Sequence, residues 1–250
     1  MHPDPDRTRR RAMARRRTSR RFRPWRWIAA ALCVFLVMTA GPVLVLRHVD
    51  PPTSAFMLRA KWRAMREGRE DYQTRYLWLD WEKLSPNAAL AVIAAEDQLF
   101  PFHAGFDLKA IRKAWEHNQR AGAVRGASTI SQQVAKNLFL WPGKSLFRKG
   151  LEAWFTGLIE TTWSKRRTLE VYLNIAQFGD GVYGVPAAAT HLLHRAPDSL
   201  SAGDAALLAA VLPNPVRLRA DAPSAYVLDR RAWIVRQMRQ LGGVAYLDEL

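Results

Sequence analysis

The segment from Ile28 to Leu46 constrains the fold more than any other, because its 19 residues include no charged side chain. A helix of this length reaches roughly 28 Å at about 1.5 Å per residue, which matches the hydrocarbon core of a bilayer. Trp25 and Trp27 precede it, where indoles favour the membrane interface. A cleaved signal peptide is the alternative, but its apolar core is usually about 7–15 residues long. We therefore predict an uncleaved transmembrane helix over residues 28–46.

The arm before this helix, residues 1–27, is strongly basic. It carries eleven arginines against two acidic residues, within a chain whose net charge is +16. A basic arm by itself would fit nucleic acid, but positive charge flanking a span is retained on the cytoplasmic side. We interpret the arm as a topology signal and expect no nucleic-acid partner. Everything after Arg47 is expected to lie outside.

Two regions are expected after the span: a connector over residues 47–84 and a folded domain over residues 85–250. The connector contains an amphipathic segment, residues 55–66, in which large apolar side chains alternate with lysine and arginine. A solvated helix face and a helix lying on anionic lipid both fit this pattern. The only cysteine, Cys33, falls in the apolar segment, so the outer domain contains no disulfide.

The domain has the pattern of a series of helices with recognisable caps, and sustained strand alternation is absent. The predicted helices run from Ser85 to about Leu99, over 107–121, from Ser128 to Leu140, from Ser145 to Trp163, from Ser164 to Gly179, from Ala202 to Leu212 and from Tyr226 to Leu241. We therefore predict a mainly α fold.

Glu96 is the first candidate catalytic residue, since it ends the apolar run "NAALAVIAA". Burial and the helix dipole both disfavour a charged carboxylate at a helix C-terminus, so its pKa should be raised. A raised pKa suits a general acid or base. An ordinary surface Glu-Asp pair at a helix end is the alternative, with His103 and Asp107 forming a structural pair nearby.

The stretch "GASTISQQVAKNLFL" carries amides and a lysine on a helix that is otherwise apolar. Amides beside a lysine suit sugar and phosphate oxygens, and hydroxyls at a helix start suit an anion. An ordinary amphipathic helix is the alternative. The candidate binding residues are Ser128, Thr129, Gln132, Gln133, Lys136 and Asn137.

A third polar stripe consists of Lys144, Arg148 and Glu152, spaced at i, i+4 and i+8. It fits either an anion site or an exposed ion-pair ladder. The chain has no Ser-x-x-Lys acyl-transfer signature and no glycine-rich phosphate loop. His191 and His194 lie one turn apart without a further ligand cluster, so no metal site is predicted.

Together these stretches resemble the family 51 glycosyltransferases, the peptidoglycan polymerases. Five of the family's motifs occur in order over roughly residues 78–220. The sequence lacks a transpeptidase signature, and in this respect it resembles the monofunctional branch of the family. The matching residues are Glu96, Asp97, Phe100, His103, Gly105 and Asp107; Gly126, Ser128, Thr129, Ile130, Gln132, Gln133, Lys136 and Asn137; Arg148, Lys149, Glu152 and Ala153; then "TLEVYLNIAQFGDGVYGVPAAA" and "AALLAAVLPNP".

The resemblance implies a lysozyme-like, two-lobed helical domain that joins lipid II into β-1,4 glycan with inversion, releasing undecaprenyl pyrophosphate. Glu96 would be the general base, and Glu152 would be the second essential carboxylate. Lys136, Lys144 and Arg148 would neutralise the pyrophosphate. Ser128, Thr129, Gln132, Gln133 and Asn137 would line the substrate site, with Asp97, Phe100 and His103 supporting it.

The resemblance also implies surroundings and partners. The enzyme would be a single-pass inner-membrane protein with a cytoplasmic N-terminus and a periplasmic catalytic domain. Its substrates would be lipid II and lipid-linked glycan, and other cell-wall synthesis proteins are candidate partners. The sequence demands no cofactor, although Mg²⁺ or Mn²⁺ could assist at the pyrophosphate.

One position departs from the family, which has arginine where this chain has Lys144. Charge is retained there, but the bidentate guanidinium fork is lost. Two other functions are compatible with parts of the pattern. A lysozyme-like hydrolase would share the catalytic glutamate but has no pyrophosphate to neutralise, and an inactive membrane scaffold would need neither Glu96 nor Glu152.

The charge asymmetry around the span predicts a cytoplasmic arm and an outward domain. A reporter fused after Leu250 that works only outside the cytoplasm should therefore be active, whereas one that works only in the cytoplasm should be silent. The opposite pattern of reporter activity would refute this topology.

Overall fold

The computed structural model describes residues 24–107, 128–143 and 145–250, which belong to two compact units, Met1–Met38 and Thr39–Leu250. The described part of the first unit is the N-terminal portion of helix α2, Pro24–Leu46. The predicted apolar helix is thus present and begins a turn earlier than expected. By length and composition α2 can cross a membrane, which is compatible with a single-pass anchor.

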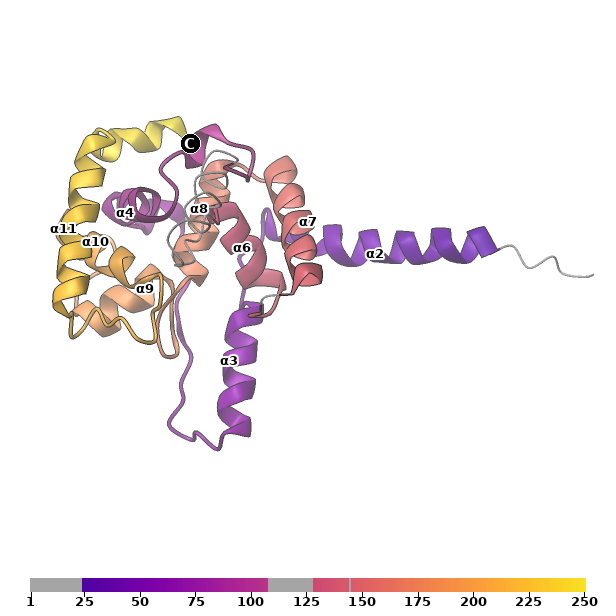
Figure 1. Ribbon diagram of the computed structural model, residues 1–250, viewed down its shortest axis with the longest axis horizontal. Helices are drawn as coiled ribbons and strands as arrows, with labels where there is room; N and C mark the ends of the chain where they lie inside the picture. The colour runs from indigo at the N-terminus through magenta and orange to yellow at the C-terminus, as the bar shows by residue number, and fades with distance from the viewer. Residues whose placement is uncertain (1–23, 108–127, 144) are drawn as a thin grey trace, which may run out of the picture. The chain divides into compact units, whose positions relative to one another are not determined.

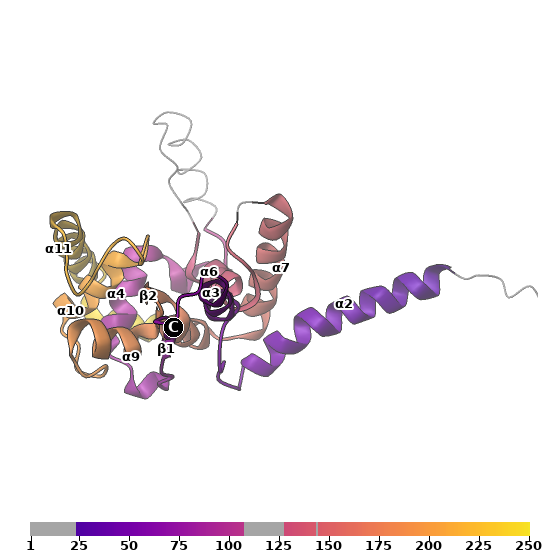
Figure 2. The same ribbon diagram turned by 90° about the horizontal axis from the view of Figure 1, so that it is seen from below.

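The second unit is mainly helical, as predicted. Figure 1 and Figure 2 show α10 and α11 on one side and α7 on the other, with α6 between them. Helix α4 packs against α10 and α11, α6 packs against α7, α8 and α3, and a contact between α4 and α8 joins the two groups. The helices are α3 (Ala55–Arg66), η1 (Trp81–Lys83), α4 (Pro86–Glu96), η2 (Phe100–Phe102), α6 (Ile130–Phe139), α7 (Leu146–Thr162), α8 (Lys165–Ile175), α9 (Gly184–Ala188), η3 (Ala189–Leu193, a π-helical turn), α10 (Ala202–Val211), α11 (Ala225–Gln240) and η4 (Gly243–Glu249).

Helix α4 forms the centre of the core. Every residue from Ala88 to Ala94 is buried, as expected for a helix that is apolar on all sides. Its alanines allow close approach of α10, whose sequence AGDAALLAAV is similarly small and apolar. Burial fixes α4 along its length, so Glu96 at its C-terminal end has a well-defined position.

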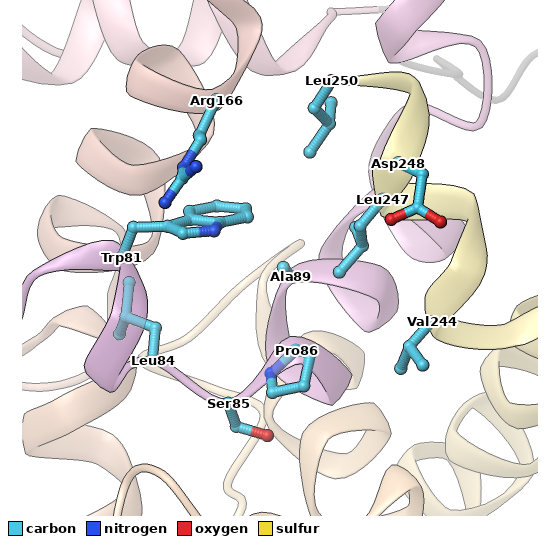
Figure 3. Close-up of a pocket in the computed structure, with 10 residues that line it drawn as sticks. All are labelled: Trp81, Leu84, Ser85, Pro86, Ala89, Arg166, Val244, Leu247, Asp248 and Leu250. Atoms are coloured by element: carbon cyan, nitrogen blue, oxygen red, sulfur yellow. The ribbon is translucent and has the colours of Figure 1, made fainter.

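A hollow of about 450 Å³ opens at the other end of α4, between η1, α8 and η4. Figure 3 shows Trp81, Arg166 and Asp248 among the side chains around it. Pro86 also lines this hollow, and it lies about 15 Å along the helix axis from Glu96. The hollow is therefore separate from the candidate catalytic residues.

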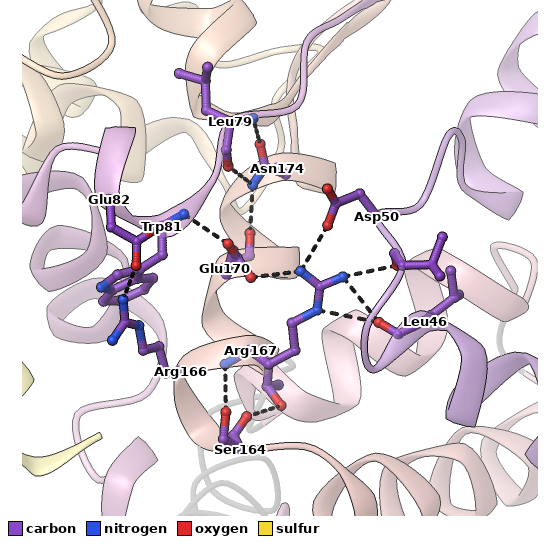
Figure 4. A network of polar contacts seen from close by, with 12 residues as sticks. Leu46, Asp50, Leu79, Trp81, Glu82, Ser164, Arg166, Arg167, Glu170 and Asn174 are labelled. Atoms are coloured by element: carbon purple, nitrogen blue, oxygen red, sulfur yellow. Dashed lines mark hydrogen bonds and ion pairs between the residues drawn. The ribbon is translucent and has the colours of Figure 1, made fainter.

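The last turns of α2, from Thr39 onward, belong to the second unit. Val43 is fully buried, and the indole N–H of Trp163 donates to its carbonyl oxygen at 2.8 Å. The guanidinium of Arg167 donates to the carbonyl oxygen of Leu46 at 3.1 Å and to Asp50 at 3.0 Å (Figure 4). Helix α8 thus holds the end of the apolar helix.

Most predicted caps are present. The hydroxyls of Ser145 and Ser164 accept the first free N–H groups of α7 and α8, and Ser201 forms a capping box with Asp204 on α10. Ser85 precedes α4 but its hydroxyl instead donates to the carbonyl oxygen of Leu200 at 3.2 Å. The helix predicted over 107–121 lies outside the described residues from position 108 onward.

The helix predicted to end at Gly179 is shorter, which is a correction to the sequence analysis. It stops at Ile175, and the next residues form two strands of a small sheet. The strand order in this sheet is β1 (Arg75–Tyr76), β3 (Val182–Tyr183), β2 (Gln177–Gly179). Strand β3 pairs parallel with β1 and antiparallel with β2. Gly184, at φ +82°, permits the turn, since an added Cβ would lie 2.4 Å from the carbonyl oxygen of Asn174. Strands of two or three residues are too short to show alternation.

Asn174 should be important for stability because it is fully buried and bridges segments far apart in the chain. Its amide oxygen accepts from the N–H of Leu79, and its NH₂ group donates to the carbonyl oxygen of Leu79, each at 2.9 Å (Figure 4). Asn174→Ala would leave these groups without partners, at about 1–3 kcal/mol each. We expect thermal unfolding in detergent to show a Tm lowered by about 5–10 °C. Asn214→Ala, at an exposed turn, is the matched control, and equal Tm values for both variants would contradict this role.

Candidate active site

Glu96 lies at the C-terminal end of α4, where α6, α8 and α11 bring polar groups towards it. The amide NH₂ of Gln133 on α6 donates to its Oε2 at 2.9 Å. Gln133 is itself held by the hydroxyl of Tyr172 on α8, which donates to its Oε1 at 3.1 Å. Nη2 of Arg230 on α11 lies 3.8 Å from Oε1 of Glu96.

Burial raises the pKa of Glu96 above its ordinary value of 4.5, in the direction predicted. The hydrogen bond from Gln133 and the charges of Arg230 and Lys136 oppose this effect, while neighbouring Asp97 adds to it. A carboxylate that is desolvated yet contacted by a few donors retains basicity and can still lose its proton. These are the properties required of a general base.

Asp97 connects the end of α4 to the start of α6. Its Oδ2 accepts from the backbone N–H of Ile130 at 3.0 Å. Its Oδ1 lies 2.9 Å from Nε2 of His103, whose Nδ1 accepts from the N–H of Gly105 at 3.1 Å. The ring proton therefore lies on Nε2 and is donated to Asp97. The structure thus pairs His103 with Asp97, a partner that the sequence analysis did not propose.

The loop after Asp97 is also fixed by a half-buried ion pair. The carboxylate of Glu160 accepts from Nζ of Lys165 at 2.9 Å and from the hydroxyl of Ser131. Lys165 also donates to the carbonyl oxygen of His103 at 2.6 Å and lies 4.7 Å from the ring centroid of Phe100. Phe100 is fully buried, so its ring anchors the loop in the core.

Thr129 and Gln132 form the capping box of α6. The hydroxyl of Thr129 accepts from the N–H of Gln132, whose side-chain oxygen accepts from the N–H of Thr129 at 3.1 Å. The same hydroxyl donates to the carbonyl oxygen of Gly105 at 2.7 Å. These contacts give both residues a structural role at the helix start. Ser128 is exposed beside them, and Asn137 is buried further along α6.

A cluster of cations lies on α7, which packs against α6. Nη1 of Arg148 donates to Oε2 of Glu152 at 2.7 Å, and Nζ of Lys149 donates to Oε1 of the same carboxylate. Arg148 and Glu152 are both buried, so their stripe is not the exposed ladder considered above. Within the described part of the chain, Nε of Arg148 is buried without a hydrogen-bond partner.

Lys136 connects the carboxylate on α4 with the cluster on α7. Burial lowers its pKa, an effect opposed first by Glu152 and more weakly by Glu96. Lys136 is therefore within electrostatic reach of both candidate carboxylates. Its ammonium also lies 5.7 Å from the ring centroid of Phe56 on α3. Lys144, the remaining predicted cation, lies outside the described residues.

Arg230 was missed by the sequence analysis. It lies in "VLDRRAWIVRQ", where an arginine on an amphipathic helix resembles any solvated cation. Its contact with Glu96 spans more than a hundred residues, so no local pattern indicates it. Among the described residues, its buried Nε also has no hydrogen-bond partner.

The described residues do not bring together three side chains of the metal-binding types, histidine, cysteine, aspartate and glutamate. Glu152 has two cations as its partners, and the neighbours of Glu96 are the amide of Gln133, the carboxylate of Asp97 and the cations Arg230 and Lys136. The arrangement as a whole combines a half-buried carboxylate of raised pKa on α4 with a cluster of cations on α6 and α7.

Comparison with known proteins gives consistent matches. Residues 63–239 match the transglycosylase family. The biosynthetic peptidoglycan transglycosylase of Xanthomonas axonopodis pv. citri (strain 306) is 54% identical over 92% of this chain and 94% of its own length. That of Xanthomonas oryzae pv. oryzae is 53% identical over 91% and 93%, and that of Xylella fastidiosa (strain 9a5c) is 51% identical over 90% and 92%.

Replacing Arg230 should change the titration of Glu96. In Arg230→Gln a cation is lost from the neighbourhood of Oε1, so we expect the pKa of Glu96 to rise further above its usual value. Side-chain ¹³C NMR of glutamate-labelled protein measures this pKa, with the Glu96 signal assigned from a Glu96→Gln sample. Arg236→Gln, on an exposed position of the same helix, is the control. A Glu96 pKa that fell or stayed constant in Arg230→Gln would show that the contact has no electrostatic effect.

Proposed function

Because the chain belongs to the transglycosylase family, we propose that it is a peptidoglycan glycosyltransferase that polymerises lipid II into β-1,4-linked glycan and releases undecaprenyl pyrophosphate. The observation that carries this proposal is the occurrence together of a half-buried carboxylate of raised pKa on α4 and a cation cluster on α6 and α7 in which Nε of Arg148 has no hydrogen-bond partner among the described residues. One group removes a proton from the attacking hydroxyl, and the other stabilises the departing anion.

Glu96 takes the proton. The ionised carboxylate would accept it from the 4-hydroxyl of the incoming lipid II, whose oxygen attacks the anomeric carbon of the lipid-linked growing chain. Because the bond to pyrophosphate breaks as the new glycosidic bond forms, a single displacement inverts the α-linked donor to a β-linkage. The Gln133 contact at 2.9 Å holds the carboxylate in place while leaving it an acceptor for the proton.

Arg148, Lys136 and Lys149 would neutralise the charge that develops on the pyrophosphate. The unpartnered Nε of Arg148 supports this role, because buried N–H groups are nearly always bonded and an anionic oxygen would satisfy it. Both oxygens of Glu152 are already engaged by Arg148 and Lys149. We therefore assign Glu152 to holding these cations in position rather than to transferring a proton.

The start of α7 suits a lipid-linked substrate. Leu146 and Phe147 are exposed immediately before the buried Arg148, so an apolar edge adjoins the anion site. A pyrophosphate attached to a long polyprenyl chain requires both environments. A lysozyme-like hydrolase, in contrast, has no pyrophosphate leaving group and no need for a buried cation cluster.

We further propose that any Mg²⁺ or Mn²⁺ in the reaction arrives on the pyrophosphate, because cations surround this site. The arginine-rich arm and α2 support a single-pass inner-membrane location with the catalytic unit in the periplasm. Other cell-wall synthesis proteins are candidate partners there, and lipid-linked glycan is the second substrate.

Glu96→Gln should abolish polymerisation while leaving the fold intact. The amide has nearly the same size but cannot accept the proton, and losing general base catalysis typically costs about 10²–10⁴-fold in rate. Purified protein incubated with lipid II, with the glycan separated by size, measures the rate, and Glu249→Gln at an exposed carboxylate is the control. A variant that retained more than about a tenth of the parent rate would remove Glu96 from the role of base.

Lys144 is expected to neutralise charge on the pyrophosphate leaving group, as a point charge rather than as a bidentate hydrogen-bond donor. Lys144→Ala should slow polymerisation by about 10- to 1000-fold, as for loss of one charged contact to a developing anion. Lys144→Arg should be tolerated, because it restores the family's residue. Steady-state rates on lipid II compare the two variants. An alanine variant as fast as the parent would leave the anion site to Lys136 and Arg148.

A further inference from the structure

Helix α3 has a buried face and, separate from it, a set of exposed large apolar side chains. Met57 and Ala64 are buried against the rest of the unit. Away from this buried side, Leu58, Trp62 and Met65 are 57%, 54% and 71% exposed. Their spacing of i, i+4 and i+7 places them on a single stripe. We call these three residues the apolar stripe of α3.

Basic residues flank this stripe, and the helix itself contains no acidic residue. By helical geometry Arg66 and Arg59 lie on one side of it and Lys61 on the other. The guanidinium of Arg66 lies 4.7 Å from the ring centroid of Trp62, so the cation borders the indole. An apolar stripe containing tryptophan, bordered on both sides by lysine and arginine, is the pattern of helices that lie in a membrane interface.

The chain keeps α3 close to the end of the apolar helix α2. Only residues 47–54 connect Leu46 to Ala55, and a fully extended segment of that length spans at most about 30 Å. The segment is also fixed within its own unit, because the hydroxyl of Tyr76 donates to the carbonyl oxygen of Pro51 at 2.5 Å. A membrane that held α2 would thus lie within reach of α3.

We propose that α3 lies flat on the bilayer, with its apolar stripe among the upper acyl chains and its cations at the phosphates of anionic lipids. The inference rests on the proposed anchoring of α2. Charge complementarity selects an anionic lipid surface as the partner, since every charged side chain within α3 is basic. Exposed tryptophan and arginine also favour the headgroup level, where each satisfies an apolar and a polar contact.

Docking of α3 would have a consequence for the catalytic unit. Phe56, on the same helix, contacts the ammonium of Lys136, and α3 packs against α6. The membrane would thereby steady the helix that carries Lys136 and Gln133.

The experiment measures the depth of single positions in the full-length protein in nanodiscs. In a Cys33→Ser background, Leu58→Cys, Trp62→Cys and Met65→Cys are each labelled with an environment-sensitive dye and quenched by nitroxide lipids. Glu67→Cys is the matched control, since Glu67 is the exposed C-cap residue of the same helix and does not belong to the apolar stripe. The parent chain labelled at Cys33, which is exposed on α2, reports insertion of the anchor.

We expect quenching at positions 58, 62 and 65 to exceed that at 67 by about threefold or more in nanodiscs containing anionic lipid. It should weaken in purely zwitterionic nanodiscs. Lys61→Gln, added to the Trp62→Cys background, should shift the docking equilibrium about fivefold towards the undocked state. Arg239→Gln, on an exposed position of α11, should leave it unchanged.

The proposal would be overturned if the labels at positions 58, 62 and 65 were quenched no more than the label at position 67 while the label at Cys33 was quenched. A dye that was shielded from water but not quenched by lipid would also overturn it, in favour of a protein partner or a second copy of this chain. Absence of quenching at Cys33 would instead refute the anchor on which the proposal rests.

Discussion

The carboxylate of Asp97 is the contact on which the candidate site depends most. It accepts the first N–H of α6 and the ring N–H of His103, so one buried side chain joins the end of α4 to the start of α6. Glu96 precedes it on α4, and Gln133 follows on α6. The distance between Glu96 and the helix that carries Gln133 is therefore set by Asp97.

The two carboxylates of the candidate site, Glu96 and Glu152, have different electrostatic surroundings. Glu96 accepts a hydrogen bond from the amide of Gln133, and its nearest cation, Arg230, lies at 3.8 Å. Burial therefore has the largest effect on its pKa, which is raised. Both oxygens of Glu152, in contrast, accept hydrogen bonds from cations, Arg148 and Lys149. Two carboxylates of the same type thus have different surroundings, a difference that sets neighbouring acids apart in many enzymes.

The sequence predicted the features whose signals are local. The apolar span, most helix caps and the raised pKa of the half-buried Glu96 followed from periodicity and from side-chain chemistry, and the family motifs indicated the function. The short strands around Gly184 did not follow, because two or three residues carry no alternation. The contact of Arg230 with Glu96 depends on how distant helices pack. The capping box of Thr129 and Gln132 was not predicted, because a capping box and a binding site use the same residue types, and their role in substrate binding stays a prediction.

The burial of Val43 has a consequence for how the protein matures. This residue belongs to the apolar helix by sequence but to the core of the catalytic unit by packing, where Trp163 and Arg167 bind the adjoining carbonyl groups. The second unit therefore completes its core only when the last turns of α2 are in place. The end of the apolar helix and the catalytic unit fold as one body, and a chain cut between α2 and α3 would emerge with its core unfinished.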